Sequence, residues 1–76
     1  MTKKERQIII DHMNTDAIWL ARFRAEGNEE NAQRHLTNVL RLRHLAEALG
    51  MDVTYEIVKA NDPIYGEYNH YEYREV

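Results

Sequence analysis

The hydrophobic residues among the first 25 positions recur at the spacing of an α-helix. They form one stripe and the row beside it: Ile9, Ile10, Met13, Ala17, Leu20, Ala21 and Phe23. Thr2 and Glu5 have the spacing of a capping box, in which each side chain bonds to the backbone N–H of the other residue. The sequence therefore predicts a helix over about residues 3–26. Residues 14–16 are weak helix formers, so a local distortion could arise there.

A second helical pattern follows a sharp break at Gly27 and Asn28. Glycine suits the left-handed residue that ends a helix, and asparagine suits the cap that begins the next one. Apolar residues then recur at steps of three and four: Ala32, Leu36, Val39, Leu42, Ala46 and Leu49. Since Gly50 follows as a stop, the sequence predicts a second helix over about residues 28–49, antiparallel to the first.

The period changes to two after Gly50, which is typical of half-buried strands. In residues 51–60 the apolar side chains point one way: Met51, Val53, Tyr55 and Ile57. Asp62 and Pro63 then predict a turn, and residues 66–75 have the pattern of a return strand. If the strands pair, Tyr71 and Tyr73 join the same apolar face, and this whole face is expected to cover the helices as core.

These elements predict an α+β fold in one domain, residues 1–76. An antiparallel helical hairpin is followed by a two-stranded antiparallel β-hairpin that packs on it. A chain this short buries only about 60–65% of the surface it exposes when unfolded, and without cysteine it has no disulfide to offset the thin core. An unpaired strand edge invites pairing with another copy, so the sheet could extend across a dimer. We therefore expect a homodimer, formed through this edge, through Trp19 or through the additional apolar side of the first helix.

The amino-terminal stretch "MTKKERQIII" has a basic start but lacks the long apolar run of a signal peptide. No other segment approaches the ~20 apolar residues of a membrane span. The absence of cysteine also removes the usual signature of a small secreted domain. We expect a cytoplasmic protein that does not associate with membranes.

Residues that could carry catalysis are scarce. The chain has no cysteine and no serine, and its three glycines stand apart as helix and turn punctuation rather than in a phosphate-binding loop. His12 and Asp16 are four residues apart on the first helix, but a metal site needs three or four converging ligands. The sequence predicts a non-enzyme without catalytic residues, cofactor or bound metal.

Trp19 is the first candidate for contact with another protein, because tryptophan is enriched at binding hot spots. It either packs beneath the β-hairpin or forms an exposed patch with Ile18 and Ile8. Tyr65 and Tyr68 have no place in the predicted core and are further candidates. These residues predict a small non-catalytic module for binding or assembly. We expect it to bind its own copy, and an unidentified protein is the other partner considered.

Nucleic-acid binding is the alternative prediction, for a small regulator. Its candidate contacts are basic residues of the two helices: Lys3, Lys4, Arg22, Arg24, Arg34, Arg41 and Arg43. The formal net charge is −3, however, and the second helix begins "NEEN", which is acidic where phosphates would come closest. Protein binding is therefore the favoured interpretation.

Overall fold

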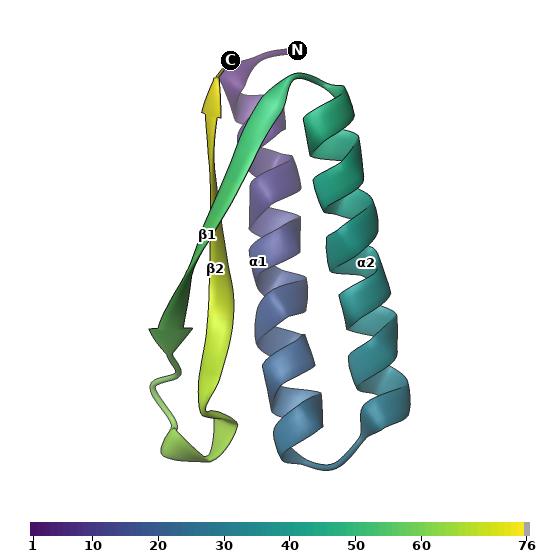
Figure 1. Cartoon of the computed structure of the whole chain (residues 1–76), viewed down its shortest axis with the longest axis vertical. Helices are drawn as coiled ribbons and strands as arrows, with labels where there is room; N and C mark the ends of the chain where they lie inside the picture. Colours follow the sequence, from purple (N-terminus) through teal and green to yellow (C-terminus); the bar gives the residue numbers. More distant parts are fainter. Residues whose placement is uncertain (76) are drawn as a thin grey trace.

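The computed structural model describes residues 1–75, apart from the side chains of Pro63 and Glu75 (Figure 1). It contains helices α1 (Lys3–Ala25) and α2 (Glu29–Ala48), followed by strands β1 (Met51–Lys59) and β2 (Glu67–Glu75). A short 3-10 helix, η1, spans Pro63–Tyr65 between the strands. The predicted α+β fold is confirmed, and each predicted helix and strand agrees with the structure to within one residue at either end.

The start of α1 has the predicted capping box. The Glu5 N–H donates to Thr2 Oγ1 at 3.1 Å, and the Thr2 N–H donates to Glu5 Oε1 at 3.0 Å. Hydrogen bonding from the Thr2 backbone N–H, and secondly from the Thr2 side chain, lowers the pKa of the Glu5 carboxyl below its ordinary value. α1 then runs without interruption through residues 14–16, so the distortion considered there does not occur.

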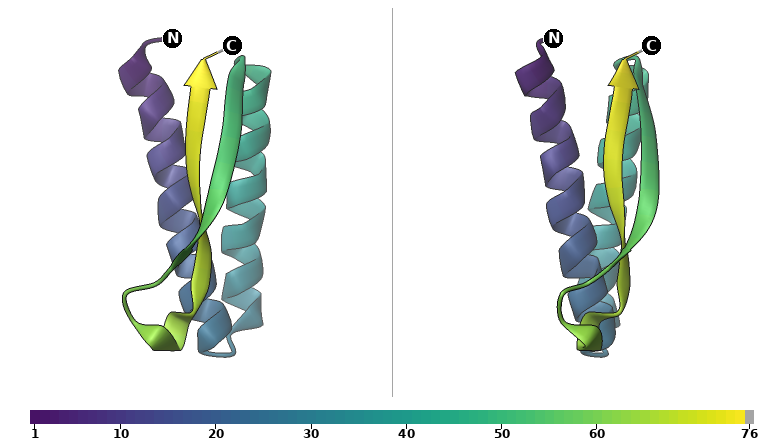
Figure 2. Two further views of the ribbon diagram at one scale, coloured as in Figure 1. Left: turned by 60° about the vertical axis from the view of Figure 1, so that its left-hand side comes forward. Right: turned by 90° about the vertical axis from the view of Figure 1, so that its left-hand side faces the viewer.

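The core lies between the two helices and the β-ribbon, which covers one side of the helix pair (Figure 2). β2 packs mainly on α1, and β1 packs mainly on α2. The buried cluster takes residues from all four elements: Ile10, Met13, Ala17, Val39, Ala46, Met51, Val53 and Tyr71. Tyr73 packs against this cluster and is partly buried. The predicted core positions of Tyr71 and Tyr73 are thereby confirmed.

Tyr55 and Ile57 depart from the predicted core. Their side chains are 52% and 62% exposed, although Met51 and Val53 on the same face of β1 are buried. The physical cause is the strong twist of a two-stranded ribbon. β1 begins beside the C-terminal end of α2, passes across β2 and ends away from α2 (Figures 1 and 2). The prediction for Tyr55 and Ile57 is wrong, and the second half of β1 leaves part of α2 uncovered.

Candidate functional site

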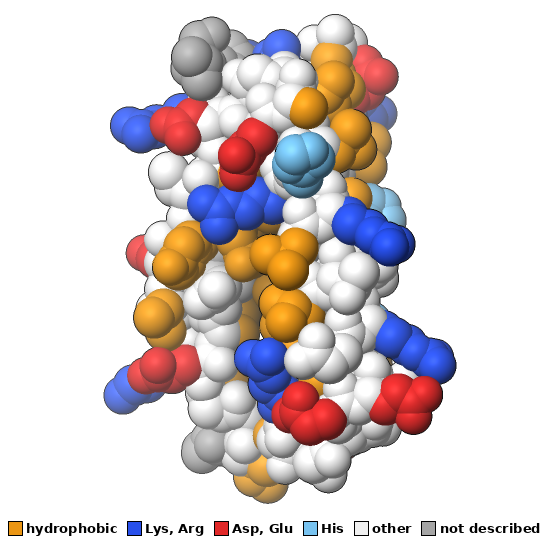
Figure 3. Space-filling model, turned by 45° about the vertical axis from the view of Figure 1, so that its right-hand side comes forward, with side chains coloured by type: hydrophobic (Ala, Val, Ile, Leu, Met, Phe, Trp, Pro, Cys, Tyr) orange, Lys and Arg blue, Asp and Glu red, His pale blue; other side chains and the backbone are white. Residues whose placement is uncertain are grey.

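The departure of β1 from α2 leaves a depression, which we call the α2 groove; Leu36 and Val39 of α2 and Tyr71 of β2 line it, and Tyr55 lies against Tyr71. A hollow of about 170 Å³ lies at its base, lined by Leu36, Val39 and Tyr71 among others. The ring of Tyr55 lies 5.8 Å from that of Tyr71, measured between centroids. Hydrophobic side chains gather around a hollow in the middle of this face, with Lys or Arg side chains above and below it (Figure 3).

The outer edge of β2 is closed at its middle by one side chain, Asn14 of α1. Asn14 Oδ1 accepts a hydrogen bond from the Tyr71 N–H at 2.7 Å, and Asn14 Nδ2 donates to the Tyr71 carbonyl oxygen at 3.0 Å. The amide therefore occupies the position that the backbone of a third strand would take. Another strand could pair with β2 here only by displacing Asn14.

The outer edge of β1 has no comparable cover. The Ala60 N–H donates to the Gly66 carbonyl oxygen at 2.8 Å, and hydrogen-bonded pairs alternate with non-bonded pairs along an antiparallel ladder. Given the observed register, Val53, Tyr55 and Ile57 direct their backbone N–H and C=O groups away from β2. Within residues 1–75 no side chain bonds to these groups, so β1 presents an open pairing edge.

A second surface, which we call the aromatic cluster, joins the C-terminal part of α1 to α2 and η1; its residues are Trp19, Arg22, Phe23, His35 and Tyr65. Trp19 stacks with Phe23 and His35 at centroid distances of 5.7 and 6.3 Å. The Arg22 guanidinium lies 5.1 Å from the centre of the Trp19 ring and 5.5 Å from that of Tyr65. His35 Nδ1 is also 2.8 Å from Asp16 Oδ1. Trp19 is thus held in place while 41% of it remains exposed.

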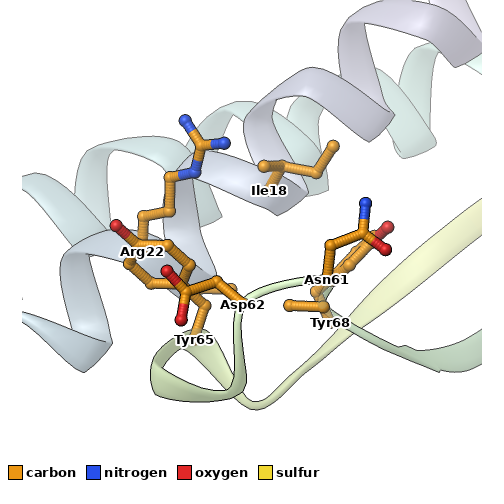
Figure 4. Close-up of a pocket in the computed structure, with 8 residues that line it drawn as sticks. Ile18, Arg22, Asn61, Asp62, Tyr65 and Tyr68 are labelled. Atoms are coloured by element: carbon orange, nitrogen blue, oxygen red, sulfur yellow. The ribbon is translucent and has the colours of Figure 1, made fainter.

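Arg22 and Ile18 of α1 face the connection between the strands across a hollow of about 180 Å³ (Figure 4). Tyr65 and Tyr68 line the same hollow and are half-buried. Trp19 does not line it, because successive helical residues point about 100° apart.

The predicted contact residues therefore fall into two places. Trp19, Ile18, Tyr65 and Tyr68 lie around Arg22. Ile8 is exposed but stands 11 residues before Trp19, about 16 Å away along the helix axis. Ile8 therefore lies about three helical turns from Trp19 and Ile18.

Replacing Arg22 by alanine is expected to lower the free energy of unfolding by about 1 kcal/mol. An exposed cation–π contact contributes about 0.5–1 kcal/mol, and Arg22 makes two. Trp19 is the only tryptophan, so its fluorescence should also shift to longer wavelength as its cover is lost. Arg41→Ala, at an exposed arginine of α2, is the matched control. An unchanged emission spectrum in Arg22→Ala would show that Arg22 does not cover the indole.

The cations of the alternative prediction are dispersed. Lys3 and Lys4 begin α1, whereas Arg22 and Arg24 lie about 27–32 Å away near its end. On α2, two of the three arginines bond to glutamates one turn away, Arg34 to Glu30 at 3.2 Å and Arg43 to Glu47 at 3.0 Å. Arg43 also lies 6.0 Å from the centre of the Tyr55 ring. Arg41 is exposed on α2. The seven residues extend over the length of both helices, and two of them are paired with glutamates.

The histidines have no shared site in the part of the chain that the structure describes. Asp16 bonds to His35 of α2 rather than to His12, its neighbour one turn away. Across residues 1–75, no group of three or more His, Asp or Glu side chains is placed to hold a metal ion. The two helices are also too polar to cross a membrane.

Comparisons with known proteins place this chain in no family. A scan against protein-family models, a search of curated proteins and a search of solved structures found no match.

Sequence reasoning missed the α2 groove and the bond of Asn14 to β2. Asn14 did leave a signal, because it is a polar residue in the helical row that contains Ile10, Ala17 and Ala21. Tyr55 and Ile57 left none, since their alternation with polar residues is the same as that of the buried Met51 and Val53.

Proposed function

We propose that the protein is a small non-catalytic assembly module that binds a second copy of itself. The observation that carries the proposal is the exposure of Tyr55 and Ile57 on the strand face that buries Met51 and Val53. These apolar side chains lie in water because the ribbon of one chain twists away from α2. A partner that covered them would extend the same core.

The neighbouring part of α2 supports this proposal. Leu40 is 55% exposed and follows Val39, which lines the hollow of the α2 groove. Contiguous exposed apolar surface marks protein-interaction sites. Domains of this size often gain stability by oligomerisation. A single self-complementary surface most simply meets its own copy across a two-fold axis.

Nucleic-acid binding has weaker support. Arg34 and Arg43 already bond to acidic side chains, and Arg22 lies against two aromatic rings. Specific nucleic-acid binding normally uses a basic surface on one face. The seven candidate cations are spread over both helices instead.

Light scattering on a sizing column tests the two functions together. The protein is run at several concentrations, at low and high salt, with and without duplex DNA. We expect twice the mass of one chain under all of these conditions, because apolar contacts depend little on ionic strength.

Two results would overturn the proposal. One is a monomer at every concentration. The other is a monomer that moves onto DNA at low salt alone, because phosphate contacts weaken steeply with ionic strength; this result would favour the regulator.

A further inference from the structure

We infer that two copies pair through β1, antiparallel and centred on Tyr55, so that their ribbons join into one four-stranded sheet. The inference rests on the proposed function and names the surface, the partner and the geometry of self-association. Each copy would supply β2 as an outer strand and β1 as an inner strand.

The pairing is assigned to β1 because the outer edge of β1 is open, whereas the outer edge of β2 is closed by Asn14. Asn14 satisfies both backbone groups of Tyr71 at the outer edge of β2, with bonds of 2.7 and 3.0 Å. The corresponding groups of Val53, Tyr55 and Ile57 point outward from β1 without a bond in residues 1–75. Open strand edges of this kind pair readily with another strand.

Charge selects one register among the three that overlap most of β1. A pairing centred on Thr54 would place Asp52 opposite the partner's Glu56. A pairing centred on Glu56 would place Glu56 opposite the partner's Glu56. Like charges directly opposite one another are destabilising. Centred on Tyr55, the pairing places Glu56 opposite the partner's Thr54 and Asp52 opposite the partner's Val58. No acidic side chain then opposes another.

The same register gives the exposed apolar residues apolar neighbours. Tyr55 would lie opposite the partner's Tyr55, and Ile57 opposite the partner's Val53. A two-fold axis perpendicular to the sheet keeps both helical hairpins on one face of it. Because β1 packs mainly on α2 and β2 on α1, the two α2 helices become neighbours across that axis.

The contact must extend beyond the strand edge to be stable. Specific dimers bury about 800 Å² per partner, roughly one seventh of the 5380 Å² that this chain exposes. A strand edge alone contributes little side-chain area. Contact between the two α2 helices, on which Leu40 is 55% exposed, supplies the remainder.

Cysteine substitutions can read the register directly, because the chain has no cysteine of its own. Thr54 and Glu56 are exposed, and their side chains lie on the opposite face of β1 from the core. In the inferred register they form a non-hydrogen-bonded pair with Cα atoms about 4.5 Å apart, within the ~4.4–6.8 Å range of disulfides. Oxidising a mixture of Thr54→Cys and Glu56→Cys should give a disulfide-linked heterodimer. Each variant alone should remain unlinked, since its own copies lie about 7–8 Å apart on the diagonal.

Other results of this experiment would overturn the inference. Cross-linking of Thr54→Cys alone, or of Glu56→Cys alone, without a heterodimer in the mixture would place the axis at that residue. A dimer by light scattering with no disulfide in any sample would exclude pairing through β1 and leave the proposed function intact. A protein that stays monomeric at every concentration would contradict both the inferred pairing and the proposed function.

Proline at position 57 gives an independent test. The Ile57 N–H points away from β2, so Ile57→Pro removes no bond of the hairpin but removes a donor needed by the partner strand. We expect self-association at least tenfold weaker, with an unchanged circular dichroism spectrum. Ile57→Val is the matched control and should still dimerise. A full-strength dimer of Ile57→Pro would overturn the inference.

Discussion

Replacing Met13 by alanine is expected to lower the free energy of unfolding by about 2–5 kcal/mol, the range for truncating a buried methionine. Met13 is fully buried at 0% exposure, within the cluster that contains Ile10, Val39 and Tyr71. Domains have roughly 0.05–0.15 kcal/mol of stability per residue, which is about 4–11 kcal/mol for 76 residues. The change therefore removes a large fraction of the total. Urea unfolding followed by circular dichroism measures it.

Met13→Leu is the control, because it nearly conserves side-chain volume and should cost less than about 1.5 kcal/mol. All variants are compared at one protein concentration, since dimerisation stabilises the folded state by mass action. A loss below about 1 kcal/mol in Met13→Ala would mean that α1, α2 and the ribbon do not pack around this side chain.

Much of the fold could be predicted because its signals are local. The period of 3.6 gave the two helices, and the period of two gave the strands. Thr2 marks the start of α1 through a hydrogen bond, and Gly50 marks the end of α2 through its backbone conformation. Both signals extend over only a few residues. The placement of Tyr71 on the strand face toward the helices followed from strand pairing.

The uncovered surface could not be predicted, because it depends on the path of the ribbon in space. Val53 and Tyr55 have the same alternation in sequence, yet Val53 is 7% exposed and Tyr55 is 52% exposed. The difference arises from the twist between them, which accumulates along a ribbon with no third strand to flatten it. Alternation tells which face a residue occupies and not whether that face still has a helix beneath it.

The polar contacts between distant elements could not be predicted from the sequence either. His35 bonds to Asp16 across the helix pair, and Asn14 bonds to Tyr71 across 57 positions. In the sequence Asp16 stands one turn from His12, and Asn14 lies in a segment of weak helix formers, so neither residue indicated its distant partner. Their partners become visible only once α1 has been packed against α2 and β2.

Replacing Asn14 by alanine is expected to lower the free energy of unfolding by about 2–3 kcal/mol. A buried or part-buried backbone group left without a partner costs about 1–3 kcal/mol, and Asn14 serves both the N–H and the C=O of Tyr71. The gain in helix propensity from asparagine to alanine offsets about 0.7 kcal/mol or less. Urea unfolding gives the loss, and hydrogen exchange at the Tyr71 amide should quicken with it.

Asn38→Ala separates the loss of the hydrogen bonds from the gain in helix propensity. Asn38 is an exposed residue inside α2, so the same substitution there makes the same change in helix propensity. Asn38→Ala should leave the free energy of unfolding equal or slightly raised, and hydrogen exchange at the Tyr71 amide should be unchanged. If Tyr71 exchanges equally slowly in Asn14→Ala, then α1 does not close the edge of β2.

Closing one edge also has a consequence for assembly. With β1 engaged in the dimer and β2 closed by Asn14, the four-stranded sheet has no open edge at Tyr71, and growth stops at two copies. Asn14→Ala opens both ends of that sheet, and strand pairing that does not close on itself produces extended polymers. Light scattering of Asn14→Ala should therefore show a mass that rises above the dimer with concentration, whereas Asn38→Ala should remain at the dimer. An Asn14→Ala protein that stays a dimer at all concentrations would show that another feature limits the assembly.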